Sequence, residues 1–328
     1  MIVTDQATER ELESASEKLR ELEQMIGRAL VGQRTVVREV LVALASAGHV
    51  LVEGLPGMGK TLLVRCLAAA MGGKFSRIQF TPDLMPSDVT GHAMFDMRSE
   101  SFHIRRGPIF CNLLLGDEIN RAPAKTQSAM LEAMQEQQVT IEGQALALER
   151  PFLVLATQNP IEQEGTYPLP QAQLDRFLLK VFIDYPEIDD ELAVVRQVTT
   201  GHVGDELDVS RVEKILGPED VLELQRVAAN LGIDDKVLDY AVRIVRTTRD
   251  WQGIETGAGP RASVALVRAA RAHGLLGGNG FVAPDDVKAV APAVLRHRLK
   301  LSADLEIEGY QPDDVLSDLL ANVAAPRS

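Results

Sequence analysis

Apolar residues in the first part of the chain recur at spacings of three and four, the period of an α-helix. Over Glu9–Leu30 they form one apolar seam, with Glu, Lys and Arg on the other faces. The pattern predicts an amphipathic helix. The repeat is too short for a sustained heptad series, which favours packing on its own domain over a coiled coil. Helical spacing resumes at Thr35–Ala47, after a break at Val31-Gly32-Gln33.

A different pattern, short apolar runs bounded by turn residues, begins at His49–Glu53. Such runs are typical of parallel strands that are buried on both faces. Helical patterns at Leu62–Ala70 and Ala124–Gln137 lie between the runs, so the alternation predicts an α/β fold with a parallel sheet. Phe75–Thr81 alternates apolar and polar residues and predicts a half-buried strand. The other apolar runs are Ile109–Gly116, Phe152–Thr157 and Leu178–Ile183.

Pro82–Pro108 interrupts this alternation. The segment is rich in turn residues and holds two short apolar runs, so we expect a small irregular insertion that folds over the core. Gln138–Leu148 has two alternating runs around Gly143, which predicts a hairpin.

From about Asp184 the strand patterns stop and helical patterns follow one another. Several of them begin with Pro and acidic residues, which suit the first turn and the positive end of the helix dipole. We therefore expect a helix at 1–30, an α/β domain at 31–186 and an all-helical domain at 187–328. The helical patterns are Glu191–Val198, Pro218–Leu231, Lys236–Arg249, Pro260–His273, Pro284–Leu299 and Pro312–Val323.

Composition narrows the class of protein. The 328 residues include 34 Lys and Arg against 47 Asp and Glu, a net charge of −13. Nucleic acid is not an expected partner, because sequence-independent binding depends on cationic groups. Cys66 and Cys111 are the only cysteines, which excludes a disulfide framework or a Cys-based metal site and suits a reducing compartment. With neither a signal-peptide pattern nor a transmembrane segment in the sequence, we expect a cytoplasmic protein.

The segment Gly54–Thr61 fits G-x-x-x-x-G-K-[ST], the phosphate-binding P-loop, and lies between a predicted strand and a predicted helix. Its glycines let backbone N–H groups face a polyphosphate, and the helix N-terminus adds partial positive charge. Lys60 can reach the β- and γ-phosphates of ATP, and the Thr61 hydroxyl can ligate Mg²⁺. A chance glycine-rich turn is disfavoured, because the flanking elements and an acidic pair later in the chain are all present.

That acidic pair, Asp117-Glu118, follows a buried strand. At the carboxyl end of a strand beside the P-loop, Asp117 would hold Mg²⁺ and Glu118 would activate the attacking water. A pair that only caps the next helix is the alternative, and the P-loop makes it less favoured. Asn159 ends the next strand and could hydrogen-bond the γ-phosphate or the water, although Asn-Pro is also a turn signal.

Two arginines are candidates for stabilising charge on the transferred phosphoryl group. Arg176 follows Leu174-Asp175, and a surface ion pair explains it equally well. Arg261 begins a helix after Gly259-Pro260, where a cation is unfavourable by ~0.3–1 kcal/mol unless an anion lies nearby. A shared phosphate would resolve that conflict, and an exposed arginine that tolerates the cost is the alternative.

Together these segments resemble the MoxR family of AAA+ ATPases, relatives of the magnesium-chelatase ATPase subunits. The resemblance extends over most of the chain from about Leu30. Its most specific stretches are Val31–Gln33, Gly54–Thr61, Gly116–Pro123 with Gln127–Glu136, Ala156–Pro160, Gln171–Phe177 and Pro260–Ala262.

The resemblance implies a role for each stretch. Asp117-Glu118 corresponds to Walker B, Asn159 to sensor 1, Arg176 to the arginine finger and Arg261 to sensor 2, which acts in its own chain or on a neighbour. The insertion and the hairpin correspond to segments that face the pore or the substrate, and the helical domain to a lid. The expected nucleotide-binding set is Gly54, Leu55, Pro56, Gly57, Met58, Gly59, Lys60, Thr61 and Leu62 of the P-loop region, together with Gln33.

The resemblance also implies a function. It predicts ATP hydrolysis with Mg²⁺ in a hexameric ring, used for chaperone-like remodelling or maturation of client enzymes. A protein with a von Willebrand factor A domain is the partner it suggests. Two alternatives stay open: a scaffold that nucleotide binding assembles, with incidental hydrolysis, and a motor that acts on DNA. The acidic net charge disfavours the motor.

Overall fold

The structure is a computed structural model that describes residues 8–55, 57–159, 166–199, 209 and 212–326. Pro56 of the P-loop therefore lies outside the described residues. No helix in these ranges is long and apolar enough to cross a membrane.

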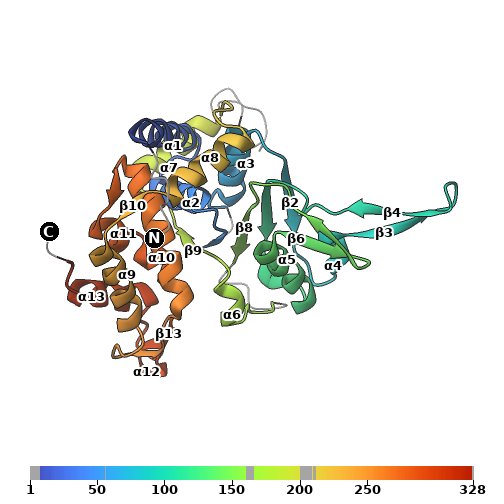
Figure 1. Cartoon of the computed structure of the whole chain (residues 1–328). Helices are drawn as coiled ribbons and strands as arrows, with labels where there is room; N and C mark the ends of the chain where they lie inside the picture. Colours follow the sequence, from blue (N-terminus) through green and yellow to red (C-terminus); the bar gives the residue numbers. More distant parts are fainter. Residues whose placement is uncertain (1–7, 56, 160–165, 200–208, 210–211, 327–328) are drawn as a thin grey trace.

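A five-stranded parallel sheet forms the centre of the first half (Figure 1). Its order is β2-β5-β8-β1-β9, so the P-loop strand β1 lies between β8 and β9. Successive residues of β1 belong to different hydrophobic clusters, Val50 and Val52 to one and Leu51 to the other, because both faces of the strand are covered. The strands are β1 Val50–Gly54, β2 Phe75–Gln79, β5 Leu113–Asp117, β8 Leu153–Gln158 and β9 Leu179–Ile183. The predicted parallel sheet is confirmed.

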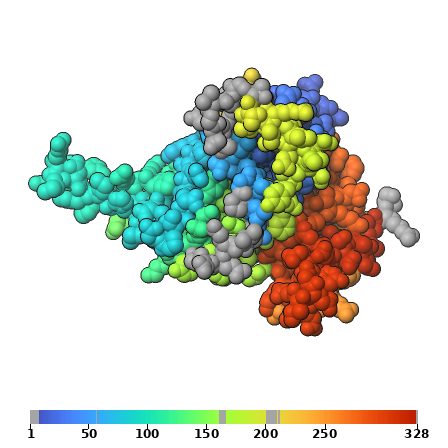
Figure 2. Space-filling model, turned by 180° about the vertical axis from the view of Figure 1, so that it is seen from behind, coloured from blue at the N-terminus to red at the C-terminus, as the bar shows by residue number. Residues whose placement is uncertain are grey.

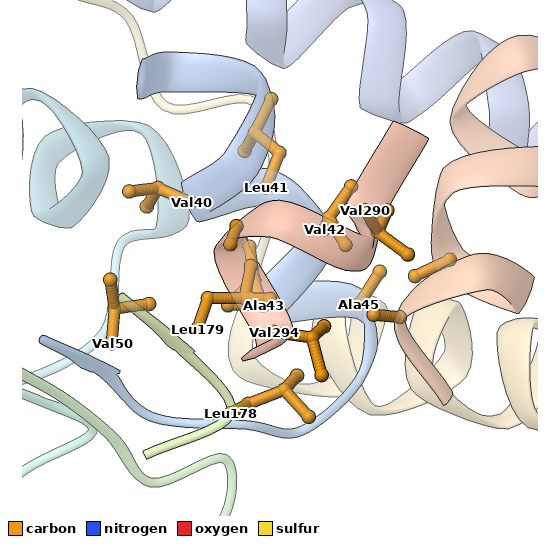
Figure 3. Packing of buried hydrophobic residues seen from close by; sticks show 14 of the residues in the cluster. Val40, Leu41, Val42, Ala43, Ala45, Val50, Leu178, Leu179, Val290 and Val294 are labelled. Carbon is orange, nitrogen blue, oxygen red and sulfur yellow. The ribbon is translucent and has the colours of Figure 1, made fainter. Parts of the chain in front are cut away.

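Helices cover both faces of the sheet. The helix α5 (Ala124–Glu136) buries Met130 and Met134 in the cluster that holds Leu51. The helices α2 (Arg34–Ala45) and α3 (Lys60–Met71) belong to the other cluster, and α3 follows β1 directly through the P-loop. The helix α2 is buried on nearly all sides, as Figure 3 shows around Val40–Ala45. Residues of β9 and of the later helix α11 (Pro284–Leu295) pack around it, so α2 joins the sheet to the helical region.

The first helix, α1 (Glu9–Ala29), packs on its own chain, which confirms that interpretation over a coiled coil. It buries Leu19, Leu22 and Ile26 and contacts α2, α3, α8 (Pro218–Ala229) and α10 (Pro260–Gly277). Thr8 and Glu11 begin the helix with a reciprocal capping box.

The insertion differs from the prediction. After the short helix α4 (Pro86–Thr90), the strands β3 (Gly91–Asp96) and β4 (Ser101–Arg106) pair antiparallel as one hairpin. This hairpin projects away from the body of the molecule instead of folding over the core (Figures 1 and 2). Ile104 is half-buried against the core, but Met94, Phe95 and Phe102 are exposed, and the two Phe rings pack on each other with centroids 5.2 Å apart. They therefore cannot serve as a cover for the core.

The second predicted hairpin is confirmed as β6 (Gln138–Ile141) and β7 (Gln144–Ala147). The region after β9 is mainly helical, as predicted, but it also contains two short strand pairs, β10–β12 and β11–β13. These strands have two or three residues each, too few to leave a readable alternation. The short helix α6 (Gln171–Leu174) lies between β8 and β9. The remaining elements after β9 are α7 Ile188–Thr199, β10 Gly232–Ile233, α9 Asp235–Thr247, β11 Ile254–Thr256, β12 Phe281–Val282, β13 Lys300–Leu301, α12 Ala303–Ile307 and α13 Pro312–Asn322.

Candidate functional site

The P-loop turns between β1 and α3 on two glycines in the left-handed region, Gly57 at φ +84° and Gly59 at φ +82°. A β-carbon at Gly59 would lie 2.9 Å from Leu30 Cδ1, so both the dihedral angle and the space favour glycine. Gly59 caps α3 without any side-chain hydrogen bond to the first turn. The N–H groups at this helix end are therefore available to an anion.

One cavity of 270 Å³ opens beside the P-loop. Most of its walls come from the carboxyl ends of β2, β5 and β8 and from the start of α3, where ligands bind in open parallel sheets. It is lined by Gly57, Gly59, Lys60, Thr61, Leu62, Arg77, Gln79, Asp117, Glu118, Thr157 and Asn159.

Asp117 is 7% exposed and is held by two groups. Arg77 Nε lies 2.7 Å from one carboxylate oxygen, and the Thr157 hydroxyl donates to the other at 3.3 Å. The same Thr157 oxygen accepts the backbone N–H of Glu118 at 2.9 Å. One hydroxyl of β8 thus fixes the relative position of the two acidic residues.

Glu118 has an unusual backbone conformation, with φ +57° and ψ +51°. A residue other than glycine in this region costs on the order of 1 kcal/mol and is uncommon. The turn directs the Glu118 carboxylate into the cavity, where it accepts a hydrogen bond from Gln79 Nε2 at 2.9 Å. Arg121 Nε lies 3.2 Å from the same oxygen.

The cavity combines the cations Lys60 and Arg77 with two carboxylates, and Lys60 is the cation at the P-loop. Lys60 Nζ donates to the Gly54 carbonyl at 2.7 Å. Burial lowers the pKa of the Lys60 ammonium, whereas the charges of Asp117, Glu118 and Glu53 act in the opposite direction. The cation and the free N–H groups suit a phosphate chain, and the oxygens of Thr61 and Asp117 are the ligand type that Mg²⁺ prefers.

Gly116, directly before the acidic pair, has a structural explanation. A β-carbon there would lie 3.0 Å from the Phe80 ring and 3.6 Å from Met130 Sδ. Because β5 is buried on both faces, the small residue lets Phe80 and α5 pack against the strand.

The structure brings together most of the predicted site residues but not all of them. Arg176 and Arg261 do not line the cavity. Arg261 Nη1 instead lies 3.8 Å from Asp175, so this carboxylate supplies the anion expected near the start of α10. Gln33 is also outside the cavity, where its amide donates to the Asp184 carbonyl at 2.7 Å. The roles of these three residues stay predictions.

Three residues of the cavity were not predicted to belong to it: Arg77, Gln79 and Thr157. Thr157 could have been suspected, because it lies two residues before Asn159 at the end of an apolar strand. Little in the sequence indicates that Arg77 and Gln79 of β2 line the cavity, because their position depends on the pairing of β2 with β5.

Comparison with known proteins supports the assignment that this geometry suggests. Residues 49–179 match the profile of the ATPase family associated with various cellular activities (AAA), and residues 246–319 match the AAA lid domain. A crystallised candidate ATPase from Cytophaga hutchinsonii superposes with a TM-score of 0.88 at 39% identity, with 97% of this chain and 98% of that chain covered.

Among curated proteins, the chain is 44% identical to Chaperone MoxR1 of Mycobacterium tuberculosis, over 92% of this chain and 81% of that protein. It is 45% identical to the uncharacterised protein YeaC of Bacillus subtilis, over 92% of each. The magnesium-chelatase 38 kDa subunit of Acidiphilium rubrum is more distant, at 29% identity over 64% of this chain and 60% of that protein. From the P-loop, the acidic strand end, the lid and these relatives, the chain belongs to the MoxR family of AAA+ ATPases.

Proposed function

We propose that the protein hydrolyses ATP to ADP and phosphate, with Glu118 as the general base. The observation that carries this proposal is the convergence of Lys60, Asp117, Glu118 and Asn159 on one cavity at the P-loop. Phosphoryl transfer requires mainly positioned charge and a positioned nucleophile, and these side chains supply both. Lys60 would bind the β- and γ-phosphates, and Asn159 would orient the water or the γ-phosphate.

Thr61 and Asp117 would hold Mg²⁺. Mg²⁺ held there would neutralise the negative charge that develops on the transferred phosphoryl group. The Thr157 hydroxyl orients Asp117 for this role through one carboxylate oxygen, and the other oxygen is paired with Arg77. Glu118 lies one residue further and is anchored to the same hydroxyl through its backbone N–H.

A second part of the proposal is that a neighbouring copy completes the site. The cavity contains no arginine in the position of a finger, apart from Arg77, which is paired with Asp117. Arg176 and Arg261 lie together beside Asp175, outside the cavity of their own chain. We propose that both face the nucleotide of the next subunit in a ring, which the family resemblance suggests is hexameric.

The work that hydrolysis would drive is chaperone-like remodelling or maturation of protein clients. The relative named Chaperone MoxR1 supports this role, and so does the projecting hairpin, which exposes Met94, Phe95 and Phe102 as an apolar contact surface. A partner with a von Willebrand factor A domain, a client enzyme and a cytoplasmic location remain predictions. We expect no nucleic acid partner.

Glu118→Gln tests the catalytic assignment. The amide keeps the size of the side chain but cannot accept the proton of water, so the variant should bind ATP normally and hydrolyse it at least about 100-fold more slowly. Turnover is measured by phosphate release, and binding by a fluorescent ATP analogue. Turnover at the wild-type rate would show that Glu118 is not the base. A second measurement compares the wild-type rate of hydrolysis with and without a client protein. A rate that rises in the presence of client indicates a remodeller, whereas an unchanged rate indicates a scaffold.

A further inference from the structure

The short segment that carries Arg176 is held by the lid. Arg298, which follows α11, inserts a guanidinium that is 4% exposed. Its Nε donates to Asp175 Oδ1 at 2.7 Å, and its Nη2 donates to the Phe177 carbonyl at 2.7 Å. Its Nη1 donates to the Leu178 carbonyl at 3.1 Å. Arg298 therefore contacts the residues on both sides of Arg176.

The neighbouring lid residue strengthens the same attachment. A ring nitrogen of His297, Nε2, lies 3.1 Å from the Phe177 carbonyl. The side-chain amide of Gln171 donates to the His297 carbonyl at 2.9 Å. Gln171 begins α6, and Asp175 ends it, so the lid binds this short helix at both ends. Both attachments come from two consecutive lid residues, so they move together.

Asp175 is shared between two lid arginines. Arg298 approaches one oxygen from the buried side, with its Nη1 also donating to the Val294 carbonyl at the end of α11. Arg261 lies 3.8 Å from the other oxygen and is 55% exposed at its side chain. Arg261 is thus paired with the carboxylate of the residue that directly precedes Arg176, and Arg298 of the lid holds that carboxylate in place.

We propose that Arg298 is a positioning residue for Arg176. It fixes Asp175 to Leu178 against the lid, so that Arg176 follows every movement of the lid and transmits it to the nucleotide of the neighbouring subunit. This inference rests on the proposed trans role of Arg176. Arg298 touches neither nucleotide nor cavity, and it acts only through the segment that it binds.

A lysine cannot replace Arg298 in this position. The guanidinium presents donors in a fixed planar arrangement, which here reaches the Asp175 carboxylate and the carbonyls of Phe177, Leu178 and Val294. An ammonium at the end of a flexible stem is a point charge with three donors and cannot span these acceptors. Arg298→Lys therefore keeps the positive charge beside Asp175 and removes the geometric constraint on Arg176.

Arg296 provides a matched control from the same stretch. Its side chain is 9% exposed, pairs with Asp313 within the lid, and joins the lid to the α/β region through the Lys180 carbonyl. Within the described part of the chain, its hydrogen bonds and its ion pair reach no residue of 171–178. Arg296→Lys thus changes a buried lid arginine of similar environment without touching the Arg176 segment.

The test compares Arg298→Lys, Arg296→Lys and Arg176→Ala as full-length chains. For Arg298→Lys we expect kcat to fall about 100-fold, the loss expected of a group displaced by about 1 Å, with unchanged KM and affinity for a fluorescent ATP analogue. Adding Arg298→Lys to Arg176→Ala should lower kcat no further, because both act through one group. Arg296→Lys should stay within about twofold of the wild type.

Mixed assemblies then locate the defect. Each variant is co-expressed with Glu118→Gln chains that carry a different tag, and the mixed assemblies are purified through both tags. Glu118→Gln chains cannot hydrolyse ATP in their own sites, but they have intact Arg176 and Arg298. They should therefore supply Arg176 to the sites of neighbouring Arg298→Lys or Arg176→Ala chains and raise turnover in those sites at least tenfold. A defect in the chain's own site or fold would not be restored.

The outcomes separate the inference from the function on which it rests. Rescue of Arg176→Ala without rescue of Arg298→Lys would overturn the positioning role alone, as would a wild-type kcat for Arg298→Lys. Absence of rescue for Arg176→Ala would overturn the trans role and the inference with it. If Arg298→Lys does not fold, as judged by circular dichroism, Asp175→Asn removes the charged partner without the buried substitution and should show the same loss and rescue.

Discussion

The side-chain amide of Gln79 donates a hydrogen bond of 2.9 Å to the Glu118 carboxylate. Gln79 is the last residue of β2, and β2 pairs with β5, whose end leads into Glu118. A general base must release such a partner, or share it, before its oxygen can accept a proton from water. The Gln79–Glu118 bond therefore opposes hydrolysis until the carboxylate turns toward the nucleotide.

Gln79→Leu should accelerate basal hydrolysis. The substitution removes the donor and keeps a similar side-chain volume at an exposed strand end. A net hydrogen bond is worth about 1 kcal/mol, so kcat should rise about fivefold with ATP affinity unchanged. Phosphate release at saturating ATP measures this. A lower kcat at unchanged affinity would show that Gln79 instead holds Glu118 in its working position.

Arg77→Met tests the competition between a fixed cation and Mg²⁺ for Asp117. Arg77 Nε lies 2.7 Å from Asp117 Oδ2, but its side chain is 51% exposed, so the pair contributes at most about 1 kcal/mol. Removing the cation should leave Asp117 more available and lower the half-saturating Mg²⁺ concentration about threefold. Hydrolysis is titrated with MgCl₂ at fixed ATP.

Arg105→Met is the control for this titration, because Arg105 is an exposed arginine on β4 and does not line the cavity. It should leave the Mg²⁺ midpoint unchanged. A midpoint that rises in Arg77→Met would mean that Arg77 orients Asp117 for the metal and does not compete with it.

The sheet and much of the cavity could be predicted because both depend on local pattern. The apolar run Leu113–Leu115 and the P-loop each identify a strand end, and parallel strands place their carboxyl ends at one edge. Asp117, Lys60 and Asn159 therefore follow from sequence alone as neighbours. Arg77 and Gln79 do not, because nothing local specifies that β2 lies beside β5.

Long-range contacts and exposed apolar faces escaped prediction for the same kind of reason. Arg298 binds Asp175 across a separation of 123 residues, and no spacing rule connects them. In the insertion, the apolar residues of β3 and β4 indicated a buried face, but Phe95 and Phe102 pack on each other and stay exposed. The hydrophobic pattern of a sequence shows that one face of an element is apolar, but it does not show whether the core, a partner or solvent covers that face.

Glu39 should make stability depend on pH. This carboxyl on α2 is half-buried, and burial raises its pKa from 4.5 to about 7, with Arg296 acting in the lowering direction and Asp313 in the raising direction. The folded state therefore holds the proton more tightly than the unfolded state. The free energy of unfolding should fall as pH rises from about 4.5 to about 7, by up to about 3 kcal/mol, and then level off.

Glu39→Gln isolates this contribution. The amide cannot ionise, so the variant should unfold at a higher temperature than the wild type at pH 8 and at a similar temperature at pH 5. The comparison is needed because buried His49 has its pKa lowered to about 4 and gives the opposite slope between about pH 4 and 6.5. Thermal unfolding followed by circular dichroism measures both proteins. An equal difference between them at the two pH values would contradict the raised pKa.

Phe102→Ser tests the projecting hairpin as the client-binding surface. The Phe102 side chain is 73% exposed and packs on the Phe95 ring, so its loss should change the free energy of unfolding by less than about 0.5 kcal/mol. Basal hydrolysis should also be unchanged, because the hairpin does not line the nucleotide cavity. The variant should lose at least half of its ability to suppress aggregation of reduced lysozyme, measured by light scattering.

Phe281→Ser is the control, since Phe281 is 67% exposed on β12, and it should retain full suppression. Equal suppression by both variants would exclude the hairpin as the site of contact with unfolded chains.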